Sequence, residues 1–290
     1  MSPRRNARAA VPRALPRRPA TRGRTRALGQ HFLRDRSVAD RILELVTPTA
    51  RDLVVEIGPG RGALTEPLAA RAGRLLALEI DVALAAALQG RFAASPQVEI
   101  RQADARQFDY AGLRALAPDP AGRVLVVGNL PYSVGKPILA ALVEAGPAID
   151  EMALMLQKEV AERVAAGPGG KTYGALSVLT QVAAAARLAF TVPPGAFSPP
   201  PQVDSAVLYL TPHRAPPVPV ADPARFGAVV RAAFGQRRKS LANALAAGLA
   251  LSPERARHLA QAAGIDPGRR AETLSLAEFA RLAAPSPSGP

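Results

Sequence analysis

The segment "GNLPYSVGKP" (128–137) follows the apolar run 124–127, which is typical of a buried strand. Asn129 brings an amide oxygen that can accept a hydrogen bond from an amine, and a backbone carbonyl beside it can accept a second one. Pro131 would stiffen the turn, and the flat ring of Tyr132 could stack on an extruded base. The alternative interpretation is a proline turn with a buried, hydrogen-bonded Asn.

A glycine turn follows an earlier apolar segment, in "EIGPGRGALTEPL" (56–68). Gly58, Gly60 and Gly62 would let the backbone approach a ligand closely, although glycine turns also join strands to helices for packing reasons. The spacing is G-x-G-x-G rather than the dinucleotide fingerprint, and no Lys-Ser/Thr pair follows as in a P-loop. The turn alone therefore indicates a nucleotide site only weakly.

Two carboxylates end the next two predicted strands. Glu79, which comes 21 residues after Gly58, could accept both ribose hydroxyls of an adenosine group. Asp104 could accept a hydrogen bond from an adenine amine, and its alternative role is a helix cap or turn residue. We assign Asp81 to the N-cap of the following helix. Because the carboxyl ends of parallel strands meet at the ligand-binding edge of an α/β sheet, these groups together predict an adenosine-containing cofactor.

The pattern E-x-G-x-G-x-G, then E-x-D, then A-D resembles the class I S-adenosylmethionine-dependent methyltransferases. With that cofactor, the chemistry of residues 129–132 becomes specific. An adenine amine is a poor nucleophile because its lone pair is delocalised into the ring. Accepting both of its hydrogens steers the lone pair toward an activated sulfonium methyl group, so position and electrostatics can replace a strong base.

The proline-rich segment "PPGAFSPPPQVDSAV" (193–207) offers a second aromatic residue. Phe197 is flanked by prolines, so we do not expect it to be a regular core residue, and it could form the other wall of a base sandwich with Tyr132. A hydrophobic plug on a loop is an equally supported alternative.

Apolar periodicity predicts the elements that position these residues. Strands alternate with helices, which predicts a doubly wound, Rossmann-like α/β sheet. Two late strands without a clear helix between them predict a closing hairpin. The predicted strands are 52–57, 74–80, 98–104, 123–129, 151–157, 187–192 and 204–210. The predicted helices are 37–46, with Ser37 as N-cap, 63–72, 81–94 and 158–166.

Nine prolines between residues 191 and 220 exclude helix there and mark a change of architecture. Only helical patterns follow, at 225–234, 239–249, 253–264 and 274–283. The sequence therefore predicts three parts: a basic tail over 1–26, a methyltransferase domain over 27–212 and a small α-helical domain over 213–290.

Arginine dominates the charge, since 37 Lys and Arg against 23 acidic residues give a net charge of +14. This surplus favours a polyanionic partner, nucleic acid before membrane, and no segment has the apolar length of a bilayer span. The absence of cysteine excludes disulfides and thiolate metal sites and is typical of a reducing compartment, so we expect a cytoplasmic protein. Three widely spaced histidines predict no metal site.

Residues 1–26 hold nine arginines and no acid, and their composition predicts disorder. We consider three interpretations: a basic extension without a role of its own, an arm that binds RNA, and a mitochondrial transit peptide. The many prolines and few hydroxyls of the tail disfavour the transit peptide.

Over about residues 26–284 the chain resembles the KsgA/RsmA family, the small-subunit ribosomal RNA adenine dimethyltransferases. The motifs occur in the family's order: "LGQHFL", "EIGPGRGALT", "EID", "AD", "NLPY", "MLQKEVAERV", "YGALSVLTQ", "FSPPPQVDSAV" and "FGQRRKSLANAL". The family usually has Asn where His31 stands. Histidine can still hydrogen-bond a cofactor carboxylate or backbone, and it could make cofactor affinity sensitive to pH.

The resemblance implies transfer of four methyl groups from S-adenosylmethionine, two to each of two adjacent adenines near the 3′ end of the 16S small-subunit rRNA. It implies a small ribosomal subunit precursor as the partner, and we expect a monomer. The residues implied to bind the cofactor are His31, Leu33, Gly58, Gly60, Glu79, Asp104 and Asn129. Those implied to hold the target base are Asn129, Leu130, Pro131, Tyr132 and Phe197.

A basic run, Arg237, Arg238 and Lys239, has Arg231 one helical face away and contains no acid. A run of this kind is usually a solvated face. Because the resemblance is to an RNA-directed enzyme, we interpret this run as the start of a helix that contacts RNA phosphates.

Two other functions stay open. An Erm-type methyltransferase, which modifies one adenine of large-subunit rRNA, would also suit the basic tail. A non-catalytic RNA-binding assembly or transcription factor would keep the fold without the activity, and the intact Glu79, Asp104 and Asn129 argue against it.

Overall fold

The computed structural model describes residues 30–285, so the prediction for the tail 1–26 lies outside the described residues. Five strands form the parallel part of a seven-stranded sheet of order β4-β3-β2-β5-β6-β9-β7. The four inner ones have long apolar runs because they are buried on both faces of the sheet, whereas the edge strand β4 is only partly buried. These strands are β2 (Leu53–Ile57), β3 (Arg74–Glu79), β4 (Val98–Gln102), β5 (Val124–Asn129) and β6 (Glu151–Gln157).

The two late strands complete the sheet in antiparallel orientation. Strand β9 (Ser205–Pro212) lies between β6 and β7 (Ala184–Val192) and runs antiparallel to both. The closing hairpin predicted from the sequence is therefore confirmed. Within the proline-rich stretch that precedes β9, only one 3-10 turn, η3 (Pro194–Ala196), is helical.

Helices cover both faces of the sheet, and the strand residues alternate between them. Along β2, Val54 packs in the same core as helices α2 (Arg36–Val46) and α3 (Thr65–Ala69). Its neighbour Val55 packs in the core of the opposite face, which contains residues of α5 (Gly135–Glu144) and α6 (Lys158–Ala165). The doubly wound architecture predicted from the sequence is confirmed, although the sequence patterns missed α5.

Side-chain caps set the start of two helices near the site. Asp81 caps α4 (Val82–Arg91) by accepting from the backbone N–H groups of Ala83 and Leu84 at 2.8 and 3.2 Å, as predicted. For α2 the predicted cap is wrong, because Asp35 is the N-cap and its carboxylate accepts from the Ser37 backbone N–H at 2.9 Å.

A second, two-stranded sheet has no clear sequence signal. Strand β1 (Phe32–Leu33) pairs antiparallel with β8 (Phe197–Ser198), which brings the beginning of the described chain against the proline-rich segment. Short 3-10 turns complete the connections, at η1 (Ala111–Leu116), η2 (Gly146–Ala148) and η4 (Ala271–Thr273).

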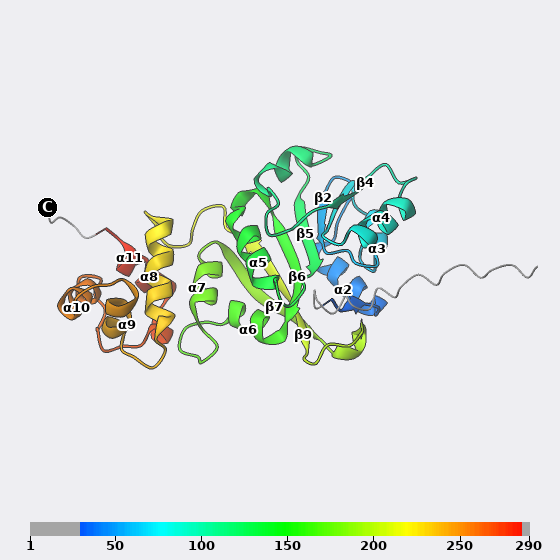
Figure 1. Cartoon of the computed structure of the whole chain (residues 1–290). Coiled ribbons are helices and arrows are strands. Elements are labelled where there is room, and N and C mark those ends of the chain that lie inside the picture. The colour runs from blue at the N-terminus through cyan, green and yellow to red at the C-terminus, as the bar shows by residue number, and fades with distance from the viewer. Residues whose placement is uncertain (1–29, 286–290) are drawn as a thin grey trace, which may run out of the picture.

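After β9 the described elements are all helical, as the sequence patterns predict. They are α8 (Pro223–Gly235), α9 (Leu241–Gly248), α10 (Pro253–Ala262) and α11 (Leu276–Ala283), and they lie at one end of the molecule beside α7 (Ala175–Gln181) (Figure 1). Their apolar core includes Tyr173 and Val178 from the α7 region. Among residues 30–285, no helix is both long and apolar enough to cross a membrane.

Candidate active site

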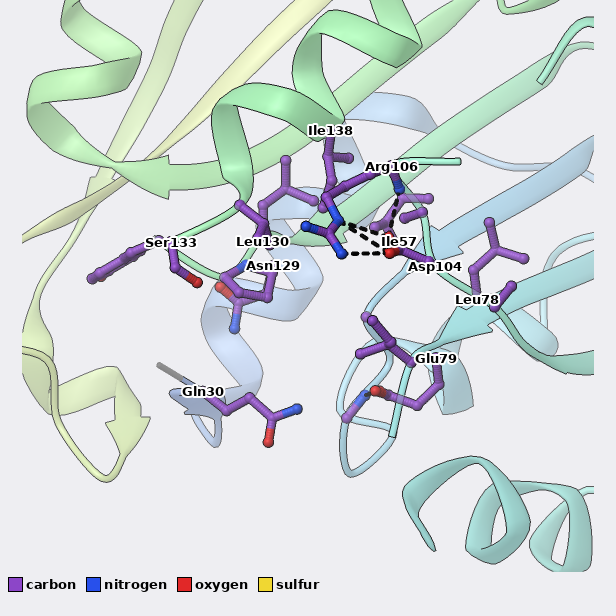
Figure 2. A pocket seen from close by; sticks show the side chains of 18 of the residues that line it. Gln30, Ile57, Leu78, Glu79, Asp104, Arg106, Asn129, Leu130, Ser133 and Ile138 are labelled. Atoms are coloured by element: carbon purple, nitrogen blue, oxygen red, sulfur yellow. Dashed lines mark hydrogen bonds and ion pairs between the residues drawn. The ribbon is translucent and has the colours of Figure 1, made fainter. Parts of the chain in front are cut away.

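A cavity of about 270 Å³ opens where the parallel strands end. Side chains from the ends of β2, β3 and β5, from the turn after β4 and from the segment before β1 point into it (Figure 2). The predicted residues that line this cavity are His31, Gly58, Gly60, Glu79, Asp104, Asn129, Leu130, Pro131 and Tyr132.

The glycine turn forms one wall and requires glycine for conformational and steric reasons. Gly58 and Gly60 have φ values of +66° and +57°, in the left-handed region that other residues avoid. A Cβ atom on Gly60 would also lie 2.9 Å from the ring of Phe32. The main chain can therefore approach a bound group here without intervening side chains.

Glu79 is fixed by main-chain donors. Its Oε2 accepts from the Gly60 N–H at 3.0 Å and its Oε1 from the Asp81 N–H at 2.9 Å. The side chain is buried, and burial raises the pKa of Glu79 while these hydrogen bonds oppose the rise. Each carboxylate oxygen keeps a lone pair for a further donor such as a ribose hydroxyl.

Asp104 is held by a side chain that the sequence interpretation missed. The Arg106 guanidinium bonds both carboxylate oxygens, with Nη2 to Oδ2 at 2.6 Å and Nε to Oδ1 at 3.0 Å, and the Arg106 N–H donates to Oδ1 at 2.9 Å (Figure 2). This pairing holds the pKa of Asp104 below its usual range. The alternative turn role of Asp104 therefore coexists with its place in the cavity wall.

Asn129, at the end of β5, is oriented by the main chain of the segment before β1. Its Nδ2 donates to the His31 carbonyl at 2.8 Å, so Oδ1 is left as the acceptor. Leu130, which follows, is buried, and its N–H donates to the Met155 carbonyl at 3.0 Å. The amide is thus positioned by backbone contacts on both sides.

Tyr132 presents its ring to the cavity and anchors its hydroxyl away from it. The hydroxyl lies 2.7 Å from the Ser205 Oγ, and the ring centroid lies 5.5 Å from that of His31. His31 is itself fixed, because its Nδ1 is 2.9 Å from the Pro199 carbonyl and must donate to it.

Two predicted site residues do not line this cavity. The Phe197 side chain is only 2% exposed and packs in the sheet core, so the prediction that it stands outside the regular core is wrong. The reason is the pairing of β8 with β1, which turns this side chain inward opposite Leu33. The Leu33 side chain is buried in the same core and does not face the cavity.

Other lining residues carried no clear sequence signal as site residues. The amide oxygen Oε1 of Gln30 is buried without a hydrogen-bond partner within residues 30–285, and the side chain lies at the cavity (Figure 2). Its place in the resemblance motif "GQHFL" was the available signal. Arg106 could have been noticed as the cation nearest to Asp104 in the sequence.

Glu56 is a buried carboxyl group beside the glycine turn, on β2. It is 1% exposed, and its Oε2 has no hydrogen-bond partner within the described residues. Burial raises the pKa of Glu56 to about 8, and the nearby Glu79 contributes to the rise. Glu56 is therefore mainly protonated at neutral pH.

The predicted RNA-binding residues lie outside the cavity, among the C-terminal helices. Arg231 is exposed on α8. Arg237, Arg238 and Lys239 are exposed in the turn before α9, so the prediction that they start a helix is wrong. Arg237 donates a hydrogen bond to the Lys171 carbonyl.

The residues present fit an adenosine cofactor with an amino-acid part. Glu79 offers acceptors for ribose hydroxyls, the glycine turn offers close main-chain approach, and Gln30 offers a buried acceptor that has no partner among residues 30–285. Together with the doubly wound sheet, this arrangement defines a class I methyltransferase, with Asn129 at the end of the cavity opposite Glu79 (Figure 2).

Comparison with known proteins gives the family. A model of the ribosomal RNA adenine dimethylase family matches residues 22–285. The ribosomal RNA small subunit methyltransferase A of Chromohalobacter salexigens is 46% identical over 268 residues, which cover 92% of each chain. The protein of the same name from Geobacter sulfurreducens is 46% identical over 258 residues, or 89% of this chain and 93% of the other.

Solved structures agree on the fold. The 23S rRNA methyltransferase ErmE has a TM-score of 0.64 and 27% identity, covering 87% of this chain and 98% of that one. A dimethyladenosine transferase from Plasmodium falciparum has a TM-score of 0.71 at 22% identity, covering 87% and 96%. The chain belongs to the ribosomal RNA adenine dimethylase family, and it is an S-adenosylmethionine-dependent rRNA adenine methyltransferase.

Proposed function

We propose that this chain dimethylates N6 of two adjacent adenines near the 3′ end of small-subunit rRNA, as part of ribosome biogenesis. The observation that carries the proposal is the orientation of Asn129, whose Nδ2 is engaged by the His31 carbonyl and whose Oδ1 is left as an acceptor. The relatives at 46% identity, which are named for the small subunit, support this choice of RNA.

The target base would be held by the turn 129–132. Oδ1 of Asn129 and a backbone carbonyl of this turn accept the two hydrogens of the adenine amine, which aims the nitrogen lone pair at the methyl donor. The Tyr132 ring stacks on the base, and its bond to Ser205 keeps the ring in place. Because the polar groups are already fixed, little reorganisation is needed during transfer.

The cofactor supplies a methyl group on a positively charged sulfur, which needs no further activation. Glu79 would hold the ribose hydroxyls, Asp104 the adenine amine, and Gln30 with His31 the amino-acid end. With this group bound, Asn129 would hold the adenine amine in line with the methyl donor, and the proton released on methylation would leave to solvent. The protein's own part is therefore alignment and exclusion of water.

We further propose that the chain acts as a cytoplasmic monomer with two domains, 27–212 and 213–290. The helical domain would contact the small ribosomal subunit through Arg231 and the run Arg237–Lys239. The exposure of these four side chains supports that role.

The decisive test is methyl transfer from labelled S-adenosylmethionine to purified small and large subunits that lack these modifications, with the nucleoside product identified. Dimethyladenosine at two adjacent small-subunit positions is the expected result. Label in large-subunit rRNA would instead support an Erm-type activity, which the likeness to ErmE makes the specific alternative. RNA binding without label would indicate a non-catalytic factor.

A further inference from the structure

A second hollow lies behind the wall of the cofactor cavity. We call it the arginine hollow: it is lined by Arg34, Arg36, Arg61 and Arg91, together with Asp35 and Glu66. It is formed by the start of α2, the glycine turn and the end of α4.

The two hollows share one thin wall. In β1, Phe32 lines the cofactor cavity while Leu33 lines the arginine hollow. In the glycine turn, Gly60 lines the cavity and Arg61 the hollow. The Arg61 guanidinium lies 4.7 Å from the centre of the Phe32 ring, so a single aromatic side chain separates a cationic group from the cofactor cavity.

The positive charge of the hollow is only partly compensated. Arg91 pairs with Glu66 at 2.8 Å, and the Asp35 carboxylate is used by the backbone and hydroxyl of Ser37 at the start of α2. Within residues 30–285, neither Arg36 nor Arg61 forms an ion pair by side-chain distance. Four guanidinium groups therefore face two carboxylates that already have partners.

Two of these four guanidinium groups are held in place by hydrogen bonds to the protein. Arg34 Nε donates to the Gly195 carbonyl at 3.2 Å, which leaves its two terminal nitrogens for a ligand. Arg91 Nη1 donates to the Arg61 carbonyl at 3.3 Å, which ties α4 to the glycine turn. A solvated charged face has no need of such tethers, whereas an anion site gains from them because less side-chain entropy is lost on binding.

The guanidinium groups of the arginine hollow fit a phosphodiester. Arginine forks match phosphate oxygens with two parallel hydrogen bonds, and the target base of this enzyme must enter the neighbouring cavity. We propose that the arginine hollow binds backbone phosphates of the RNA strand that carries the target adenine.

This inference rests on the proposed function, since it needs RNA as the substrate. It differs from the contacts proposed for Arg231 and Arg237–Lys239, which lie among the C-terminal helices. Those residues would hold the ribosomal particle, whereas the arginine hollow would hold the strand next to the reacting base. Removing the positive charge of the arginine hollow should therefore weaken RNA binding and leave S-adenosylmethionine binding intact.

The test uses the full-length chain and a small-subunit rRNA fragment that contains the target adenines. Arg36→Glu with Arg61→Glu should weaken RNA binding about tenfold at low salt and lower the slope of log K against log salt by about 1.4 to 1.8, the loss of two phosphate contacts. Arg36→Glu alone, which leaves the Phe32 wall untouched, should lower the slope by about half as much. Calorimetry should show S-adenosylmethionine affinity within about twofold of the parent.

The matched control is Arg71→Glu with Arg214→Glu, which changes the net charge equally. Both residues are exposed, and they lie near the amino ends of the parallel strands, Arg71 before β3 and Arg214 after β9. The inference is overturned if the hollow variants bind RNA like this control, or if they lose cofactor affinity as much as RNA affinity. The proposed function fails separately, if the parent chain does not methylate small-subunit rRNA.

Discussion

The polar groups of the cavity fall into two sets that are held in different ways. Glu79 and Asn129 are fixed by main-chain atoms, the N–H groups of Gly60 and Asp81 and the carbonyl of His31. Tyr132 is held by the side chain of Ser205, and Asp104 is held mainly by the guanidinium group of Arg106, with one further bond from the Arg106 N–H. Main-chain partners are set by the fold, whereas side-chain partners can be exchanged for a ligand. Substitution of Glu79 or Asn129 should therefore reduce activity or cofactor affinity more than substitution of Asp104 or Tyr132.

The largest effect should follow from Asn129→Ala. Without the amide oxygen the adenine amine is no longer aligned, and we expect kcat to fall by about 10³-fold, in the range found when one preorganised polar group is removed. RNA and S-adenosylmethionine affinities should stay within about threefold. Single-turnover methyl transfer and binding titrations would check this, and an equal loss of RNA binding would contradict the positioning role.

Glu56 extends this comparison to a buried carboxyl group whose Oε2 has neither a main-chain nor a side-chain partner within the described residues. Its pKa is about 8 when folded and near 4.5 as a free group, so between these values the unfolded chain releases a proton that the folded chain keeps. Stability should therefore fall as pH rises from about 4.5 to 8, at up to about 1.4 kcal/mol per pH unit.

Glu56→Gln replaces the carboxyl group by an amide that does not titrate. Its free energy of unfolding should fall less steeply than that of the parent over the same window, with a difference on the order of 3 kcal/mol between pH 5 and pH 8. Urea unfolding at several pH values measures it. If the free energy of unfolding changes with pH in parallel for the two proteins, Glu56 is ionised in the folded chain.

Glu79→Gln keeps the shape of the side chain but replaces one acceptor oxygen by a donor that faces a main-chain N–H. We expect S-adenosylmethionine to bind about 50-fold more weakly, since a buried donor–donor contact is costly. The control is Asp81→Asn, which keeps an N-cap for α4 and should bind the cofactor normally. Equal binding by both variants would remove Glu79 from the cofactor site.

Such carboxyl-edge residues could be predicted from the sequence because topology alone brings strand ends together. Glu79, Asp104 and Asn129 each follow a recognisable apolar strand, and a parallel sheet places all three at one edge. Burial of Phe197 could not be predicted, because it depends on pairing between β1 and β8, two-residue strands far apart in the chain. Arg106 was missed because no periodic pattern shows that its side chain folds back on Asp104.

Arg106 tests whether side-chain partners can be exchanged. The oxygens of Asp104 already accept four hydrogen bonds from Arg106, so an adenine amine must compete with them. Arg106→Leu should bind S-adenosylmethionine about fivefold more tightly, while Asp104→Asn should bind about tenfold more weakly. Calorimetry on both variants decides this. Weaker binding by Arg106→Leu would make the guanidinium a wall for the adenine rather than a competitor.

The smallest effect should come from Tyr132→Phe. This change removes the bond to Ser205 but keeps the ring that stacks on the base. We expect kcat/KM for RNA to fall only about two- to threefold, against more than about tenfold for Tyr132→Ala. Similar losses in the two variants would show that the hydroxyl, and not the ring, carries the role of this residue.

The hydrogen bond from Asn129 to the His31 carbonyl has a thermodynamic consequence. The segment that supplies this carbonyl also supplies Gln30 and Phe32 to the wall of the cofactor cavity. A methyl donor that holds this segment in place therefore also holds the amide that receives the base. The two substrates are then linked, and each lowers the dissociation constant of the other by the same factor.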